Sequence, residues 1–172
     1  AEVLEDRYRQ SPQRLEILPV VVSGRLMKIA EVDRYQFMVQ QDGPVSLDLY
    51  ARRIGSNFHG VLAVFDQAGK RVADVADTEG LDVDLTFRAR AGEIYTVELH
   101  DLDFRGNRAY VYRLGFQRGP RVVTMIPAAV QRGKLQRLEF SGIGLTSGQE
   151  QRESVQADVT GPVSTQASSF VY

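Results

Sequence analysis

Apolar and polar residues alternate along most of this chain with a period of two. The alternation is clearest in "DRYQFMV", "VSLDLY" and "YVYRLGF", whose apolar positions include Tyr35, Phe37, Val39, Val45, Leu47, Leu49, Tyr110, Tyr112, Leu114 and Phe116. Successive side chains of a β-strand point to opposite faces of its sheet, so this period predicts strands that each bury one face. We therefore expect the face of Tyr110–Phe116 that carries the apolar side chains to lie in the core.

Turn sequences rich in Gly, Pro and Asp separate the alternating stretches, as in "QQDGP", "QAG" and "RAGE". Between Ile17 and Phe116 we count about eight short strands at regular spacing. No stretch of useful length has the period of a helix. The layout predicts an all-β chain whose main part is an antiparallel β-sandwich or jelly roll.

After Gly119–Pro120 the strand pattern starts again, with "VVTMIP" and "LQRLEFSG", and ends in a tail rich in Ser, Thr and Gln. Residues 119–172 have room for three or four strands, too few for a comfortable core of their own. We expect a small β segment that is either packed on the sandwich or a truncated piece of a longer module, and we favour truncation.

Composition narrows the classes of function. Of 172 residues, 43% are hydrophobic and 25% are charged, and the net charge of −1 leaves no basic surface for nucleic acid. The longest apolar stretch, Ile17–Val22, contains Pro19 and is far shorter than the ~20 residues that cross a bilayer. The chain has no cysteine, which excludes disulfides and zinc-thiolate sites. We therefore expect neither nucleic-acid binding nor a membrane span.

The stretch "HDLDFRGN" raises the question of catalysis. In a strand, Asp101 and Asp103 point to the same face and His100 to the other, which does not suit a His–Asp pair. A small hydrolase that uses Asp101 or Asp103 with His59 is the enzymatic alternative, although no serine or cysteine nucleophile motif accompanies these residues. We favour the interpretation that both aspartates cap a turn.

An acidic stretch and several aromatic residues are the candidate binding features. The acidic residues are Asp74, Asp77, Glu79, Asp82 and Asp84, with Asp33 at the start of a strand. Calcium binds six to eight oxygens, so such a set could supply ligands, although its spacing does not match an EF-hand and also suits a solvated loop. Tyr8, Tyr50 and Phe104 could stack on sugar rings if they are exposed, which makes a carbohydrate-binding module a further alternative.

Several segments, taken in order, resemble the bacterial pre-peptidase C-terminal domain over about residues 15–117. They are "LPVVVSGRL", "VDRYQF", "SNFHGVLAVFDQAGKRVAD", "DTEGLDVDLTF", "GEIYTVELHD" and "YVYRLGF". The following "IPAAVQRGKLQRLEFSGIGL" is similar to the opening of an immunoglobulin-like module. The resemblance implies a linker at 1–14, a β-sandwich of jelly-roll-like topology at 15–118 and a partial immunoglobulin-like module at 119–172.

The resemblance also implies a function. Such domains are non-catalytic appendages of exported multidomain proteins, so we expect a secreted, periplasmic or cell-surface location. The partners implied are neighbouring domains of a larger exported protein, with protein or polysaccharide as the ligand.

Some relatives hold calcium, and the positions that match their acidic residues are Asp33, Asp77 and Asp82, with Asp74 nearby and Glu5 and Asp6 in the linker. Ala76 and His59 stand where relatives often carry aspartate. We therefore expect no cofactor, and calcium is the alternative that the resemblance raises.

Overall fold

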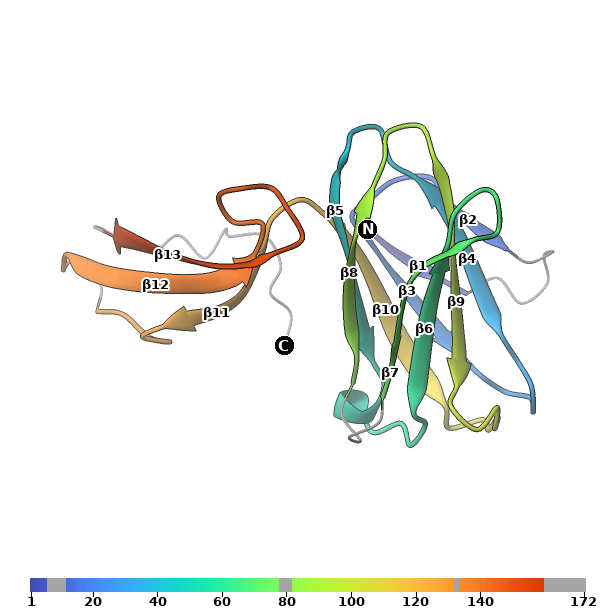
Figure 1. The fold of residues 1–172 in the computed structure, drawn as a ribbon. Helices are drawn as coiled ribbons and strands as arrows, with labels where there is room; N and C mark the ends of the chain where they lie inside the picture. The colour runs from blue at the N-terminus through green and yellow to red at the C-terminus, as the bar shows by residue number, and fades with distance from the viewer. Residues whose placement is uncertain (6–11, 78–81, 132–133, 160–172) are drawn as a thin grey trace. The chain divides into compact units, whose positions relative to one another are not determined.

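The computed structural model describes residues 1–5, 12–77, 82–131 and 134–159. Contacts within the chain divide it into two compact units, Ala1–Gly119 and Pro120–Tyr172, and each unit is described by itself (Figure 1). Among the described residues, no helix combines the length and the apolar character that crossing a membrane requires.

The first unit consists of two five-stranded sheets. The order of one sheet is β1-β3-β10-β5-β8, with bounds Glu2–Leu4, Val20–Arg25, Val111–Arg118, Gly43–Tyr50 and Asp84–Ala89. The order of the other is β2-β4-β9-β6-β7, with bounds Gln13–Leu15, Asp33–Met38, Ile94–Asp101, Gly60–Phe65 and Arg71–Ala76. A short 3-10 helix, η1 (Arg52–Ile54), follows β5. The predicted all-β sandwich is confirmed.

Strands β3 to β10 pair like the two halves of one long antiparallel hairpin. Strand β3 pairs with β10, β4 with β9, β5 with β8, and β6 with β7. The pairs β5–β10 and β6–β9 then join these ladders within each sheet. A long hairpin rolled into two facing sheets is the jelly-roll arrangement, which agrees with the expected topology.

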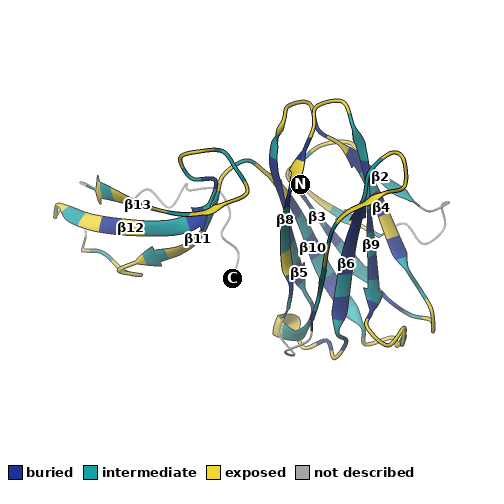
Figure 2. Ribbon diagram, viewed as in Figure 1, coloured by how far each residue is buried: buried dark blue, intermediate teal, exposed yellow. Residues whose placement is uncertain are grey.

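The core lies between the two sheets, and each strand contributes one face to it. In β10, Tyr112, Leu114 and Phe116 are at most 1% exposed, and Tyr110 just before the strand packs half-buried against them. Figure 2 shows dark-blue buried positions along the strands of the sandwich. The ring of Phe116 meets that of Phe37 edge to face, with centroids 5.7 Å apart. The predicted burial of this face is confirmed for the strand itself.

Two short strands lie in or next to the stretch expected to be a linker, residues 1–14. Strand β1 runs parallel to β3, and β2 runs parallel to β4. Each has three residues, too few to show a period that could be recognised in the sequence. Because β1 is part of a sheet, Glu5 immediately after it is held against the sandwich: its backbone N–H donates to the Ser23 carbonyl oxygen at 2.9 Å.

The second unit is an antiparallel meander of β11 (Arg121–Ile126), β12 (Gln136–Ile143) and β13 (Arg152–Val159). Of its large apolar side chains in the described ranges, Leu138 alone is fully buried, at 2% exposed, whereas Val123 and Ile126 are exposed. The assignment of this segment to an immunoglobulin-like module stays a prediction.

Candidate functional site

Three carboxylates meet beside the N-terminal strand of the sandwich. Glu5 follows β1, Glu31 lies in the loop before β4, and Asp33 is the first residue of β4. One oxygen from each of the three lies within 4.8 Å of the other two. Asp33 is 9% exposed, and the two glutamates are half-buried. Negative charges this close repel one another, so the arrangement favours a bound cation. We call these three residues the acidic cluster.

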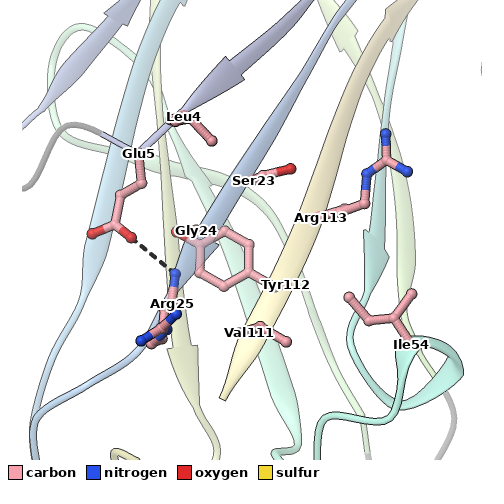
Figure 3. A pocket seen from close by; sticks show the side chains of 9 residues that line it. All are labelled: Leu4, Glu5, Ser23, Gly24, Arg25, Ile54, Val111, Tyr112 and Arg113. Carbon is pink, nitrogen blue, oxygen red and sulfur yellow. Dashed lines mark hydrogen bonds between the residues drawn. The ribbon is translucent and has the colours of Figure 1, made fainter. Parts of the chain in front are cut away.

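Backbone N–H groups orient the two glutamates of the acidic cluster. Glu5 Oε2 accepts a hydrogen bond of 2.8 Å from the N–H of Arg25 (Figure 3). Glu31 Oε2 accepts from the N–H groups of Met27 and Lys28, at 2.5 and 2.6 Å. The loop before β4 thus folds around the Glu31 carboxylate, which fixes the position of one cluster member.

Tyr112 connects the third member, Asp33, to the core. Its hydroxyl donates to Asp33 Oδ2 at 2.5 Å and is itself hydrogen-bonded to the Tyr35 hydroxyl. Burial raises the pKa of Tyr112 well above its ordinary value, and Tyr35 and Asp33 raise it further, so the hydroxyl keeps the proton that it donates. Gly24 makes room for the ring, because a Cβ there would lie 2.4 Å from Tyr112 Cζ (Figure 3).

A pocket of about 440 Å³ lies next to Glu5, and Figure 3 shows its lining. Polar and apolar side chains share it, including the exposed Leu4 and Ile54. The Arg25 backbone that binds Glu5 also forms part of the wall. One member of the acidic cluster, Glu5, therefore lines a surface pocket.

The residues of the acidic cluster fit a hard cation. Carboxylate oxygens are the ligands that calcium prefers, and three carboxylates can supply three to six of the six to eight oxygens that it takes, with water for the rest. Sequence reasoning had identified Asp33 and Glu5 but missed Glu31. The signal was present in "EVD", because residues two apart in an extended chain share a face.

Asp82, which was expected among the metal ligands, caps η1 instead. Its two carboxylate oxygens accept hydrogen bonds of 2.7 to 3.1 Å from the backbone N–H groups of Ala51, Arg52 and Arg53. The Arg53 side chain adds a bond of 2.8 Å. Burial raises the pKa of Asp82, but the bonds from the Arg53 side chain and the three N–H groups outweigh it and leave the pKa lowered. Both oxygens of the Asp82 carboxylate thus accept hydrogen bonds that hold the η1 segment in place.

Asp77 and Asp74 also lie outside the acidic cluster. Asp77 is 3% exposed, and its Oδ2, which has no hydrogen-bond partner, lies 3.8 Å from His59 Nδ1. The other ring nitrogen of His59 is 3.3 Å from a guanidinium nitrogen of Arg52. Asp74 is exposed on β7. The acidic stretch therefore does not converge with Asp33 through its described residues.

Asp101 is a turn cap, as expected, whereas Asp103 is a surface residue. Asp101 is fully buried and accepts from the backbone N–H groups of His59, Asp103 and Arg105, and twice from the Arg105 side chain, at 3.0 to 3.1 Å. Burial raises its pKa, but the bonds from Arg105 and from the N–H groups leave the pKa lowered. The hydrolase alternative needs the His59 ring beside Asp101 or Asp103, but the acid that it faces is Asp77.

The aromatic candidates differ in exposure. Tyr50 is half-buried, with the Arg53 guanidinium 4.1 Å above its ring. Phe104 is 44% exposed and stacks on His100. Three candidate residues lie outside the described part of the chain, namely Asp6, Tyr8 and Glu79.

The fold and these sites define the first unit as a jelly-roll β-sandwich with structural aspartates and one acidic cluster. No protein-family model matches the chain, and no curated protein matches it. Among solved structures, it is similar to the pre-peptidase C-terminal domain of the collagenase from Bacillus anthracis, with 15% identity and a TM-score of 0.50, over 65% of this chain and 100% of that one. This likeness confirms the expected fold and agrees with the sequence resemblance.

A second similarity is to PliG of Aeromonas hydrophila, a periplasmic inhibitor of g-type lysozyme. The identity is 10% and the TM-score 0.45, over 68% of this chain and 98% of that one. For PliG of Salmonella Typhimurium the identity is 14% and the TM-score 0.39, over 62% of this chain and 98% of that one.

Proposed function

We propose that this chain is a non-catalytic accessory or interaction module of an exported multidomain protein. The observation that carries the proposal is the state of Asp101, the buried acid nearest to a histidine in the sequence. All its hydrogen bonds go to loop N–H groups and to Arg105, so it serves to hold the loop. The likeness to a pre-peptidase C-terminal domain supports the fold that such a module would have.

Two measurements test this proposal. The purified chain should not turn over ester, peptide or glycoside reporter substrates, and antibodies against it should find it in the periplasmic or culture-fluid fraction of its source cells. Turnover that follows the protein through purification and disappears in His59→Ala would overturn the non-catalytic assignment. Detection in the cytosol alone would overturn export.

We propose as a second function that the acidic cluster binds one calcium ion. Glu31 supplies a carboxylate that makes up for the positions where Ala76 and His59 replace aspartate. Glu5 directly follows β1 of the first sheet and Asp33 begins β4 of the second sheet, so a bound ion would link the two sheets. Glu5, Glu31 and Asp33 would hold the ion, and its role would be structural.

Terbium, which substitutes for calcium, gives a direct test. Tyr112 donates to Asp33, so a terbium ion at the acidic cluster lies close to a tyrosine that can sensitise its luminescence. We expect tyrosine-sensitised terbium emission that excess calcium displaces and that Glu31→Gln removes. Asp74→Asn, an exposed acid on β7, is the matched control and should leave the signal intact. Emission that is unchanged in Glu31→Gln would place the ion elsewhere.

A further inference from the structure

An exposed aromatic ring lies at the turn that follows β9. Phe104 stacks face to face on His100, with ring centroids 4.3 Å apart and planes 6° from parallel. Phe104 is nevertheless 44% exposed. One face of its ring covers the histidine, which leaves the other face for solvent or for a ligand.

The backbone of Phe104 adopts a conformation that is unfavourable for a bulky residue. Its φ is 54°, in the left-handed region that Gly and Asn occupy most readily. Such conformations are strained and persist where surrounding contacts impose them, often at functional sites. Gly or Asn would suit this backbone better, but neither carries an aromatic ring. The backbone strain therefore accompanies an exposed ring at this position.

Hydrogen bonds on both sides impose this conformation. The N–H of Phe104 donates to the Asp101 carbonyl oxygen at 2.8 Å, and its own carbonyl accepts from the N–H of Ala30 at 2.9 Å. Ala30 also has a positive φ, of 60°. Gly106 packs so closely on the Lys28 backbone that a Cβ would lie 2.1 Å from the Lys28 carbonyl oxygen. Two loops thus brace each other, and the ring is fixed before any ligand arrives.

Polar residues are stacked on Phe104 or adjacent to it in the chain. His100 Nδ1 lies 2.8 Å from the Asp101 carbonyl oxygen, which can only accept, so Nδ1 carries a proton and donates it to that carbonyl. The side chain of Asp103 is 68% exposed and that of Arg105 is 44% exposed, with 3.6 Å between their charged atoms. The two aspartates of this loop, Asp101 and Asp103, are balanced by two arginines, Arg105 and Arg108, so the loop has no net charge and suits a neutral ligand.

We propose that Phe104, backed by His100, is a stacking platform for a neutral or N-acetylated sugar ring of a polysaccharide. The C–H face of a pyranose would lie on the ring, and Asp103 and Arg105 would bond its hydroxyl groups. This inference rests on the proposed function and names the ligand of that interaction module. A protein partner would need a larger surface, of about 800 Å² with several anchors. One exposed ring between two polar residues in the chain, Asp103 and Arg105, matches a single sugar unit.

The strain in the loop makes a sharp test possible. Phe104→Gly and Phe104→Asn remove the ring while suiting the positive φ, so both variants should melt within a few degrees of the wild type. The probes are a printed array of neutral, N-acetylated and acidic oligosaccharides and a sedimentation assay with chitin, cellulose and peptidoglycan. We expect wild-type binding to neutral or N-acetylated glycans, reduced about tenfold or more in both variants, as for loss of one stacking surface.

Matched variants distinguish stacking on the Phe104 ring from nonspecific binding to exposed apolar side chains. Phe104→Tyr keeps the ring and should bind within about threefold of wild type, because the stacking face is retained. Val72→Ala on β7 removes an apolar side chain of similar exposure, 42%, and should have no effect. Binding to no glycan, or binding that Phe104→Gly leaves unchanged, would overturn the proposal. Leu102 and Ile29 are exposed apolar residues, at 42% and 83%, in the two loops that brace each other. Loss of glycan binding in Leu102→Ala or Ile29→Ala but not in Phe104→Gly would place the binding surface away from the Phe104 ring and would also overturn the proposal.

The outcomes stay distinct from those of the proposed function. Calcium binding and the absence of turnover are measured without any glycan, so an array without hits removes the sugar platform alone. Substrate turnover lost in His59→Ala removes the non-catalytic assignment, whatever the array shows.

Discussion

Two groups of carboxylates in the same sandwich have opposite surroundings. Asp82 and Asp101 are each encircled by backbone N–H groups and an arginine, and each holds a loop in place. Glu5, Glu31 and Asp33 also accept hydrogen bonds, from backbone N–H groups and a tyrosine hydroxyl, but none of these donors is an arginine side chain, and the three carboxylates lie close to one another. The contrast indicates that a carboxylate paired with an arginine is a structural group, whereas carboxylates that lie close together are candidates for a cation.

The largest effect expected is on the structural group. Asp101→Ala should lower the free energy of unfolding by about 3 kcal/mol, because several charge-assisted hydrogen bonds to loop N–H groups are lost together. Denaturant unfolding measures this loss. Asp103→Ala, which removes an exposed acid two residues away, should change stability by less than about 0.5 kcal/mol. Equal effects of the two substitutions would show that the buried bonds of Asp101 add little.

Calcium should stabilise the chain through the acidic cluster. A ligand that binds only the native state at a hundredfold excess over its Kd adds about 2.7 kcal/mol. We expect millimolar calcium to raise the Tm by several degrees in the wild type and not in Glu31→Gln. Asp82→Asn should melt lower but keep the calcium-dependent rise. If calcium raised the Tm of Glu31→Gln but not that of Asp82→Asn, Asp82 would be the calcium ligand and Glu31 the structural carboxylate, the reverse of our assignment.

Acid should weaken the structural group. The pKa values of Asp82 and Asp101 are lowered in the folded state, where burial raises them but the hydrogen bonds outweigh it. Their contribution is therefore fully present above the unfolded pKa of about 3.9 and is lost as the pH falls through the lower folded values. Unfolding free energies measured from pH 7 to pH 2 should fall below about pH 4, and less steeply in Asp82→Asn/Asp101→Asn. If the unfolding free energy of the wild type and of the double variant fell equally steeply with pH, the lowered pKa values of Asp82 and Asp101 would be contradicted.

The smallest effect expected is on the bond that links the acidic cluster to the core. Tyr112→Phe keeps the buried ring but removes the donor to Asp33, so it should cost about 1 kcal/mol without calcium. With calcium the cost should be smaller, because the ion neutralises Asp33. Tyr110→Phe, in a half-buried tyrosine nearby, serves as the control. If Tyr112→Phe lowers the unfolding free energy more with calcium than without it, the hydroxyl stabilises the calcium-bound protein rather than the calcium-free protein.

Much of the fold could be predicted because the sandwich buries one face of nearly every strand. The period of two located β3 to β10, and the order of Tyr112, Leu114 and Phe116 gave the buried face of β10. Strands β1 and β2 were missed, since three residues cannot show a period. They are held by pairing with β3 and β4, which the local sequence does not reveal.

The candidate site was predictable only in part. The sequence pointed to Glu5 and Asp33 as candidate ligands. The further carboxylates were expected from the acidic stretch, residues 74–84, whereas the carboxylate that lies beside Glu5 and Asp33 is that of Glu31. Asp77 and Asp82 looked equivalent to Asp33 in the sequence because all three match acidic positions of the family that the chain resembles. Their partners, His59 and the N–H groups of η1, come from segments far along the chain, and only folding brings them together.

By itself the sequence determined the class of fold, the buried face of each long strand and the turn at Asp101, because alternation and turn chemistry act within a few residues. The tertiary structure decided which acids hold loops and which face one another, and which aromatic ring stays exposed. Those properties depend on burial and on donors supplied across the sheets: Asp101 is fully buried by distant segments, while Phe104, three residues later, is held at the surface by the N–H of Ala30.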